Sequence, residues 1–354
     1  MRRFVEWFLI LSCAAPCFGW GTRGHELVAY LGYIHADSAV QARIDQLVAL
    51  NPCYKQWQGV VAKDAGITAD LDKRAALFML AATWPDEIKH DPKNPLEKNP
   101  YSCQPGFAFA TNDKGKTLTG GMSADVPPAG PEASQNIGYT DTRRHQYWHF
   151  VDQPYTTDGS KTYPAETPNA ATELDLLTKA LASGGNAQVN SYDLVWIAHL
   201  MGDLHQPLHN VARFSKALPN GDQGGNSVLI CAAADKCGRD ELHAYWDALP
   251  GSDAPLHVVI AQGKQLDAQT AKLSPGATDF GVWGKQSLTM AEQDAYAKPF
   301  DTGSASVLSS AILSTYHAKA VADMQQQVEL GGLRLAQVLN AALKNRKDSC
   351  CKAA

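Results

Sequence analysis

The chain has 354 residues, of which 45% are hydrophobic and 19% are charged, and its formal net charge is −5 at pH 7. This composition is typical of a globular protein and excludes collagenous, low-complexity and compositionally disordered chains. The balance of 31 basic and 36 acidic side chains predicts none of the polybasic surface that proteins use to bind duplex DNA or anionic membranes.

The first nineteen residues have the pattern of a secretory signal peptide. Arg2 and Arg3 give a basic start, residues 5–15 are mostly apolar, and small residues occur in 17–19. Cleavage after residue 19 makes Trp20 the first residue of the mature protein. We therefore expect a secreted or periplasmic protein.

A lipidated Cys13 is an alternative to cleavage, although Leu11 is bulky for a lipoprotein motif. No later stretch approaches the roughly 18–20 apolar residues that span a bilayer. The expected mature protein is soluble, without a membrane association, and monomeric.

Helical periodicity dominates the remaining sequence. Leu27, Leu31 and their neighbours have the spacing of one helix face, and Ser191 has the place of a helix cap. Pro207 is expected to end the helix that Ser191 begins. The predicted helices cover residues 23–36, 70–82, 172–182, 191–205, 240–249, 305–316 and 318–344.

Strand signals are few. Residues 227–231 predict a strand that forms a small β-hairpin with the residues near Cys237. Residues 90–144 are rich in Pro, Gly, Asn and Asp and predict long loops. Neither a repeat nor a linker divides the chain, so residues 20–354 are expected to form one compact, mainly α domain.

Six of the eight cysteines follow residue 19, and an exported protein permits disulfides. Cys231 and Cys237 flank a short polar loop and form the first predicted pair. Cys53 with Cys103 is the second. The sequence has no Asn-x-Ser/Thr acceptor for N-glycosylation.

Two His–Asp pairs stand out in the predicted helices. His199 and Asp203 are four residues apart, as are His243 and Asp247, so each pair lies on one helix face and can reach one metal ion. One such pair is usually a surface or capping contact. Two such pairs in one chain favour a metal site, and imidazole with carboxylate suits Zn²⁺. His209 follows a proline, so it can point away from the helix face and serve a different ion.

Short motifs that contain these residues follow one another along most of the mature chain. They are Trp20-Gly21 with Gly24-His25, WPDEIK at 84–89, WHFVD at 148–152, HLMGDLHQPLH at 199–209, GGN at 224–226, LHAYWD at 242–247 and GGLRLAQVLN at 331–340. In this order they resemble the zinc-dependent, single-strand-preferring nuclease and 3′-nucleotidase family, which has fungal, plant and bacterial members. That family shares its helical fold and trinuclear zinc site with bacterial zinc phospholipase C, so the resemblance implies a phospholipase C/nuclease-like fold.

The resemblance implies three zinc ions per chain. Their implied ligands are Asp86, His149, His199 and Asp203 for the first ion; Trp20, through its amino nitrogen and carbonyl oxygen, and His25 for the second, with Asp203 bridging; and His209, His243 and Asp247 for the third, more exposed ion. The pairs found above from spacing alone fall within these sets.

The implied reaction is hydrolysis of single-stranded DNA and RNA to 5′-mononucleotides, with 3′-nucleotidase activity. Zinc ions make the site positive inside an acidic protein and lower the pKa of water from ~16 towards ~7, which supplies hydroxide for in-line attack on phosphorus. Asp86 and Asp203 are the implied catalytic carboxylates. Lys89 is the implied neutraliser of charge on the phosphorus, with a solvated surface lysine as the alternative.

Three residues are implied substrate contacts. Phe150 can stack on an unpaired base, an interaction worth roughly 1–3 kcal/mol, with core packing as the alternative. Asp152 and Asn226 can bond the base edge. His205 is expected to support a ligand or to cap its helix rather than bind metal, and the loops in 90–144 leave the substrate preference open.

Two other functions fit parts of the pattern. A zinc phospholipase C would use the same ions on a phospholipid headgroup, but that family usually presents Glu where this chain has Asp247. A secreted zinc-binding protein without catalysis is the other alternative, against which the complete ligand set argues. A di-iron helix bundle fits poorly, because paired Glu-x-x-His motifs do not occur.

Overall fold

The fold is taken from a computed structural model. The predicted signal peptide, most of the loops in 90–144, Cys103 and the C-terminal cysteines lie outside the described residues. The structure describes residues 20–89, 108–111, 117–119, 130, 133–141, 143–231, 237–270, 272–302, 306–307 and 310–344.

Helices make up most of these residues, which confirms the mainly α class. The α-helices are α1 (Thr22–Ile34), α2 (Ser38–Val48), α3 (Tyr54–Lys63), α4 (Asp70–Glu87), α5 (Ala170–Ser183), α6 (Ala187–Leu204), α7 (Leu242–Asp247), α8 (Leu256–Thr270), α9 (Phe280–Met290) and α10 (Ser310–Leu343). Short helical turns are η1 (Gly138–Thr140), η2 (Gln146–His149), η3 (Pro207–Asn210) and the π-helical η4 (Ala291–Ala295).

The prediction of two closing helices was wrong, because α10 is continuous through residue 317. Nothing at that point breaks a helix, and Tyr316 is fixed there by long-range bonds. Its hydroxyl donates to the backbone oxygen of Ala295 at 2.7 Å and accepts from the indole of Trp246 at 2.8 Å. Such contacts cannot be read from local periodicity.

The start of α6 also differs from the prediction. Asn186 caps the helix by accepting from the backbone N–H of Gln188 at 2.8 Å, as Asn side chains commonly do. Ser191 is instead buried inside the helix, where its hydroxyl donates to the backbone oxygen of Leu47 at 2.6 Å. The helix therefore begins one turn earlier than expected.

Strands are short and lie at the edges of the helical body. The predicted hairpin is present as β5 (Leu229–Cys231) antiparallel to β6 (Cys237–Glu241), and its register sets Cys231 opposite Cys237. The pairing of β5 with β7 (Ser306–Val307), and the parallel pair of β3 (Gln153–Thr156) and β4 (Val211–Phe214), were not predicted. A further antiparallel pair joins β1 (Ala108–Thr111) and β2 (Thr117–Thr119).

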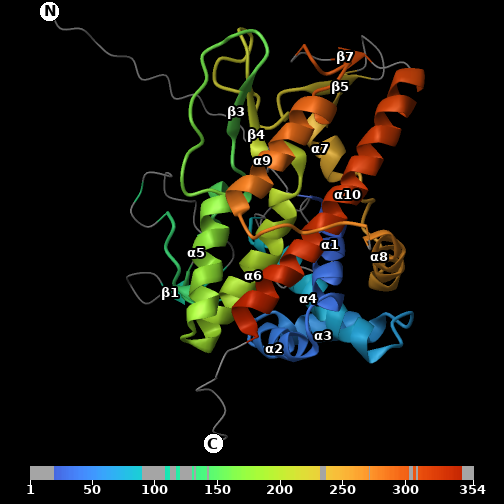
Figure 1. Ribbon diagram of the computed structural model, residues 1–354. Coiled ribbons are helices and arrows are strands. Elements are labelled where there is room, and N and C mark those ends of the chain that lie inside the picture. The colour runs from blue at the N-terminus through green and yellow to red at the C-terminus, as the bar shows by residue number, and fades with distance from the viewer. Residues whose placement is uncertain are drawn as a thin grey trace, which may run out of the picture.

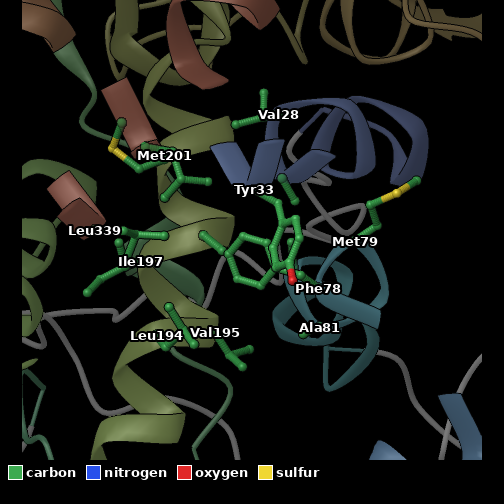
Figure 2. Packing of buried hydrophobic residues seen from close by; sticks show 14 of the residues in the cluster. Val28, Tyr33, Phe78, Met79, Ala81, Leu194, Val195, Ile197, Met201 and Leu339 are labelled. Carbon is green, nitrogen blue, oxygen red and sulfur yellow. The ribbon is translucent and has the colours of Figure 1, made fainter. Parts of the chain in front are cut away.

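Helices α1 and α6 form the centre of the molecule. Every residue from Gly24 to Tyr33 in α1 and from Asn190 to Leu204 in α6 is buried, as expected for helices covered on all sides. The long α10 crosses in front of both (Figure 1). Around them, Phe78 of α4 and Leu339 of α10 converge on the same core (Figure 2).

A close crossing of α1 and α10 depends on glycine. A Cβ on Gly332 would lie 2.3 Å from Cβ of Leu31. We therefore expect Gly332→Ala to lower the free energy of unfolding by about 2 kcal/mol, since overpacking outweighs the gain in helix propensity. In contrast, a Cβ on Gly59 of α3 would meet nothing within 4 Å, so Gly59→Ala should stabilise by up to ~1 kcal/mol. Urea unfolding of both variants tests this, and equal midpoint shifts would contradict it.

Candidate metal centre

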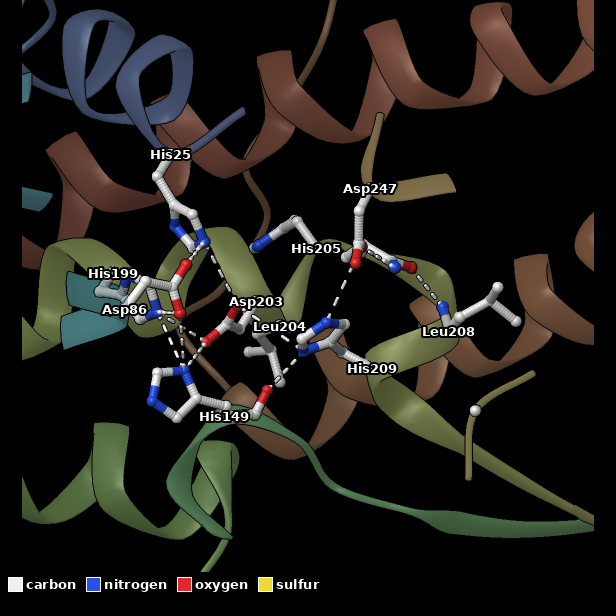
Figure 3. A network of polar contacts seen from close by, with 12 residues as sticks. His25, Asp86, His149, His199, Asp203, Leu204, His205, Leu208, His209 and Asp247 are labelled. Carbon is white, nitrogen blue, oxygen red and sulfur yellow. Dashed lines mark hydrogen bonds and ion pairs between the residues drawn. The ribbon is translucent and has the colours of Figure 1, made fainter. Parts of the chain in front are cut away.

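Buried imidazole and carboxylate side chains from six elements converge, and Figure 3 labels all of them except His243. We call five of them cluster A and three of them cluster B. Cluster A consists of His25 from α1, Asp86 from α4, His149 from η2, and His199 and Asp203 from α6; cluster B consists of His209 from η3, with His243 and Asp247 from α7.

Asp203 lies between the imidazoles of cluster A. Its Oδ2 is 3.0 Å from Nδ1 of His149 and 3.2 Å from Nε2 of His199. Its Oδ1 faces the other way, 3.5 Å from Nε2 of His25. The two oxygens of one carboxylate thus face two different positions, as a bridging ligand requires.

Asp86 is shared in a similar way. Its Oδ1 lies 3.5 Å from Nε2 of His199 and 3.8 Å from Nδ1 of His149, and its Oδ2 lies 3.7 Å from Nε2 of His25. The compact groups are therefore His25–Asp86–His199 and His149–His199–Asp203. The sequence expectation assigned Asp86 to the first ion alone, whereas in the structure it also faces His25.

Cluster B is a separate but adjacent group. Nε2 of His209 and Nε2 of His243 are 3.1 Å apart. Asp247 places Oδ2 3.5 Å from Nε2 of His243 and Oδ1 4.0 Å from Nε2 of His209. Oδ1 of Asp203 is 3.6 Å from Nδ1 of His209, so the two clusters adjoin. All three members are buried, so the structure does not make cluster B an open site.

Backbone carbonyls fix the orientation of several imidazoles. A hydrogen bond from Nδ1 to a carbonyl leaves Nε2 with its lone pair directed into the cluster, the usual arrangement of a metal-ligating histidine. The bonds run from His199 to Ala82 at 2.7 Å, from His209 to His149 at 2.6 Å and from His243 to Gly224 at 2.8 Å.

The last turns of α4 supply both Asp86 and the carbonyl that orients His199. Pro85 lies in the last turn of α4 and has no N–H to donate to the carbonyl of Ala81, four residues earlier. The helix nevertheless continues to Glu87, beyond the predicted end, and carries Asp86 on its final turn. There the carbonyl of Ala82 accepts the bond from His199.

Burial and the facing charges together set the protonation states in cluster A. Burial lowers the pKa of His25 and of His149 to about 3, so both imidazoles are neutral near pH 7. Burial also acts against the protonation of His199, but Asp203 and Asp86 outweigh it and raise the pKa of His199 above its usual value. Burial alone would raise the pKa of Asp203, but the neighbouring His199 and His209 hold it well below its usual range. Neutral imidazoles with ionised carboxylates are the forms that bind metal.

The donor set fits a divalent cation. Among the described residues, Nε2 of His25 and Oδ1 of Asp203 are buried without a hydrogen-bond partner and face each other at 3.5 Å. In cluster B, the carbonyl bonds leave two Nε2 lone pairs facing each other. Buried acceptors that converge in this way are satisfied by a shared cation, and nitrogen and oxygen donors suit zinc.

Lys89 is buried beside cluster A rather than solvated, so the surface alternative was wrong. Its side chain is 4% exposed, and Nζ lies 2.6 Å from Oδ1 of Asp86. Burial would raise the pKa of Asp86, but Lys89 and the nearby imidazoles lower it instead. The lysine thus brings a positive charge to the edge of the cluster.

Trp20 lies at the start of the described chain with its side chain fully buried. The next residue, Gly21, donates its N–H to the backbone oxygen of Asp247 at 3.0 Å. This bond holds Gly21 against α7, which carries His243 and Asp247 of cluster B. That the amino group of Trp20 is a ligand stays a prediction, since it depends on cleavage before this residue.

Phe150 and Asp152 follow His149 on an extended segment. Phe150 is half-buried, and its ring lies edge-on to that of Tyr147 with 6.3 Å between the ring centres. Asp152 has a left-handed backbone with φ of 52°. Burial, with the nearby charges of Asp222 and Glu166, raises the pKa of Asp152 to about 7.

The third predicted substrate residue lies on the loop before β5. Asn226 is half-buried, and its amide donates to the backbone oxygen of Gln223 at 2.7 Å. The same loop holds cluster B, because Gly224 accepts the bond from His243. A Cβ on Gly224 would lie 2.3 Å from the carbonyl oxygen of Leu208, so this close approach requires glycine.

Gln206 is a residue that sequence reasoning missed. It is buried, its side-chain amide donates to Oδ1 of Asp247 at 2.6 Å, and its side-chain Oε1 accepts from the N–H of Leu208 at 2.5 Å. It thereby orients a cluster B carboxylate. Its place within the HQPLH motif was visible, but the contact with a residue 41 positions later was not.

His205 caps the end of α6 and faces neither cluster. Its Nδ1 donates to the backbone oxygen of Met201 at 2.7 Å, and its Nε2 accepts from Arg334 at 2.8 Å. Burial and then Arg334 lower the pKa of His205 to about 3, so the ring is neutral.

This fold and these clusters define a helical protein with adjacent groups of buried imidazoles and carboxylates that could hold metal ions. A family model described as S1/P1 Nuclease matches residues 20–344, and the chain belongs to that family. Nuclease S1 of Aspergillus oryzae is 21% identical over 345 residues, covering 93% of this chain and 94% of that protein. The resemblance stated from the motifs is thus confirmed, and family membership supports a nuclease function.

Proposed function

We propose that this protein is a zinc-dependent nuclease that hydrolyses single-stranded DNA and RNA to 5′-mononucleotides and also has 3′-nucleotidase activity. The proposal depends chiefly on one observation, the convergence of buried imidazoles and carboxylates from six elements into two adjacent clusters. Membership of the S1/P1 nuclease family supports it.

Three zinc ions are proposed, two in cluster A and one in cluster B. Asp203 would bridge within cluster A, where Trp20 would add its amino nitrogen and carbonyl oxygen beside His25. His209, His243 and Asp247 would hold the third ion. Bound zinc supplies Lewis acidity and lowers the pKa of water towards ~7.

The other proposed roles belong to the chain itself. Lys89, already placed 2.6 Å from Asp86, would stabilise the negative charge that develops on the phosphate. Phe150 would stack on a base, which must be unpaired to present its face. This accounts for a preference for single strands without a basic groove.

Asp152 is proposed to accept hydrogen bonds from the base edge as a carboxylate. Because the pKa of Asp152 is raised to about 7, the ionised fraction of its side chain increases as the pH rises from 6 to 8. We expect the KM for single-stranded DNA to fall over that range. Asp152→Asn should raise KM about tenfold at pH 8, by loss of a charge-assisted bond of ~1.5 kcal/mol, and should remove this pH dependence.

The matched control is Asp175→Asn, an exposed carboxylate on α5. It should leave KM unchanged at every pH, and neither variant should change the metal content. If wild type and Asp152→Asn show the same KM profile between pH 6 and 8, Asp152 has no such role.

We also propose that residues 1–19 are a signal peptide and that residues 20–354 form one secreted or periplasmic, monomeric domain. N-terminal sequencing of exported protein should begin at Trp20. Disulfides are proposed between Cys231 and Cys237, which the strand register supports, and between Cys53, which is buried, and Cys103. In the described part of the chain, no helix has the length and apolar character needed to cross a membrane.

The central experiment is metal analysis of the mature protein together with matched assays. Zinc content is measured by mass spectrometry, and hydrolysis is followed on single-stranded DNA, its duplex and phosphatidylcholine. We expect three zinc ions, faster cleavage of the single strand, and products that carry a 5′-phosphate. Hydrolysis of only the phospholipid would favour a phospholipase C, and zinc binding without any hydrolysis would favour a non-catalytic protein. Full activity after complete zinc removal would refute the proposal.

A further inference from the structure

The turn between α6 and η3 determines how the two clusters sit relative to each other. Helix α6 carries His199 and Asp203 of cluster A, and η3 carries His209 of cluster B. Residues 204–208 between them contribute no member to either cluster. Any change in where α6 ends would therefore move one cluster against the other.

His205 lies in this turn with no exposed surface. Arg334 can only donate, so the bond from its Nη1 to Nε2 of His205 makes that nitrogen the acceptor. The proton then lies on Nδ1, which donates to Met201 one turn back in α6. Both ring nitrogens are used in fixing the end of the helix, and neither is available to a metal ion.

Arg334 is itself fixed by neutral groups from elements distant in sequence. Its Nε donates to the backbone oxygen of Pro275 at 3.1 Å, and its Nη2 donates to Oε1 of Gln286 at 2.6 Å. Its guanidinium lies 4.8 Å from the ring centre of Trp283. Only 4% of the residue is exposed, so the charge has a single, well-defined position from which to hold His205.

Helices α9 and α10 also hold the backbone of this turn. Gln327 of α10 donates to the backbone oxygen of His205 at 3.0 Å, and Ser287 of α9 donates to that of Leu204 at 2.7 Å. Gln327 and Ser287 also bond each other at 2.9 Å. From this fixed turn, Gln206 reaches Asp247 of cluster B.

We infer that Arg334 and His205 form a positioning pair that fixes the turn between α6 and η3 and thereby sets the geometry of cluster B. This inference depends on the proposed function, because its effect is on the ion held by cluster B. The pair acts through His209 and through the bond from Gln206 to Asp247, without touching that ion.

The test measures zinc affinity rather than activity. Wild type, Arg334→Met and His205→Phe are freed of metal and titrated with Zn²⁺ in competition with a chromophoric chelator. Both variants should bind the ion that Asp247→Ala removes about 10–100-fold more weakly, the usual cost of losing support around a metal ligand. The other two affinities should stay unchanged. His205→Gln, which keeps an acceptor for Arg334, should lose less than His205→Phe.

Two further variants separate positioning from general destabilisation. Leu339→Ala removes a fully buried side chain from the same helix as Arg334 and should lower the melting temperature without changing zinc affinity. The double variant Arg334→Met with Asp247→Ala should bind its remaining ions as tightly as Asp247→Ala alone.

The outcomes distinguish this inference from the proposed function. If wild type binds three zinc ions and Arg334→Met binds all three with unchanged affinity, the positioning pair is refuted and the proposed function stands. The same holds if Leu339→Ala weakens zinc binding as much as Arg334→Met. If wild type binds no zinc, the proposed function itself fails.

Discussion

The Asp203→Asn variant is expected to lose at least ~1,000-fold in the rate of hydrolysis of single-stranded DNA. Asp203 faces four imidazoles with its two oxygens, at 3.0 to 3.6 Å. An amide keeps the size of the side chain but loses its charge and one acceptor, so it cannot bridge two cations. A loss of ~4 kcal/mol in transition-state stabilisation, of the size that metal ions supply, corresponds to that factor.

The matched control is Asp267→Asn. Asp267 also bonds an imidazole, with Oδ1 2.6 Å from Nε2 of His35, but the pair is partly exposed and lies outside both clusters. This variant should keep wild-type activity and metal content, whereas Asp203→Asn should retain at most one zinc ion, in cluster B. Full activity in Asp203→Asn would exclude Asp203 as a bridging ligand.

Local spacing was enough to predict parts of the site. The pairs His199–Asp203 and His243–Asp247 are one helical turn apart, and in the structure each pair lies within 3.5 Å between ligand atoms. Helix periodicity fixes such pairs without knowledge of the rest of the fold. The proline after His205 likewise indicated that His209 leaves the direction of α6, and it does so in η3.

The contacts between site residues from different helices could not be predicted from spacing. Asp86 meets His25 and His199 only because α1, α4 and α6 pack together, and the sequence expectation assigned it to one ion alone. The motif resemblance supplied the members of the clusters but not these shared contacts. The bond from Gln206 to Asp247 is of the same kind, since it joins distant segments.

The fold errors have a similar origin. The break near residue 317 and the cap at Ser191 were predicted from local pattern alone, whereas the chain has no helix breaker at 317 and Ser191 lies inside α6. Tyr316 is held by Trp246 and Ala295, and Ser191 by Leu47. The strands β3 and β4 pair in parallel although they are far apart in sequence. A single short apolar run does not show which distant strand it will pair with.

Removal of zinc is expected to lower the melting temperature of the wild-type protein by at least ~10 °C. The clusters bury Asp86, Asp203 and Asp247 among imidazoles that offer lone pairs. Without a cation these acceptors face one another, and their desolvation lowers the free energy of unfolding. An ion at about 1,000 times its dissociation constant stabilises the folded state by about 4.1 kcal/mol, and ~1 kcal/mol shifts the melting temperature of a chain of this size by a few degrees.

The measurement is a thermal scan of the protein with and without a strong chelator, followed by return of Zn²⁺ or Mg²⁺. Zinc should restore the melting temperature and magnesium should not, because nitrogen donors suit zinc whereas Mg²⁺ prefers oxygen ligands. Asp203→Asn should show a much smaller response to the chelator than wild type, because it has already lost the ions of cluster A. An identical melting temperature with and without chelator would mean that the buried carboxylates are satisfied by the protein alone, and the clusters would then be structural rather than metal-binding.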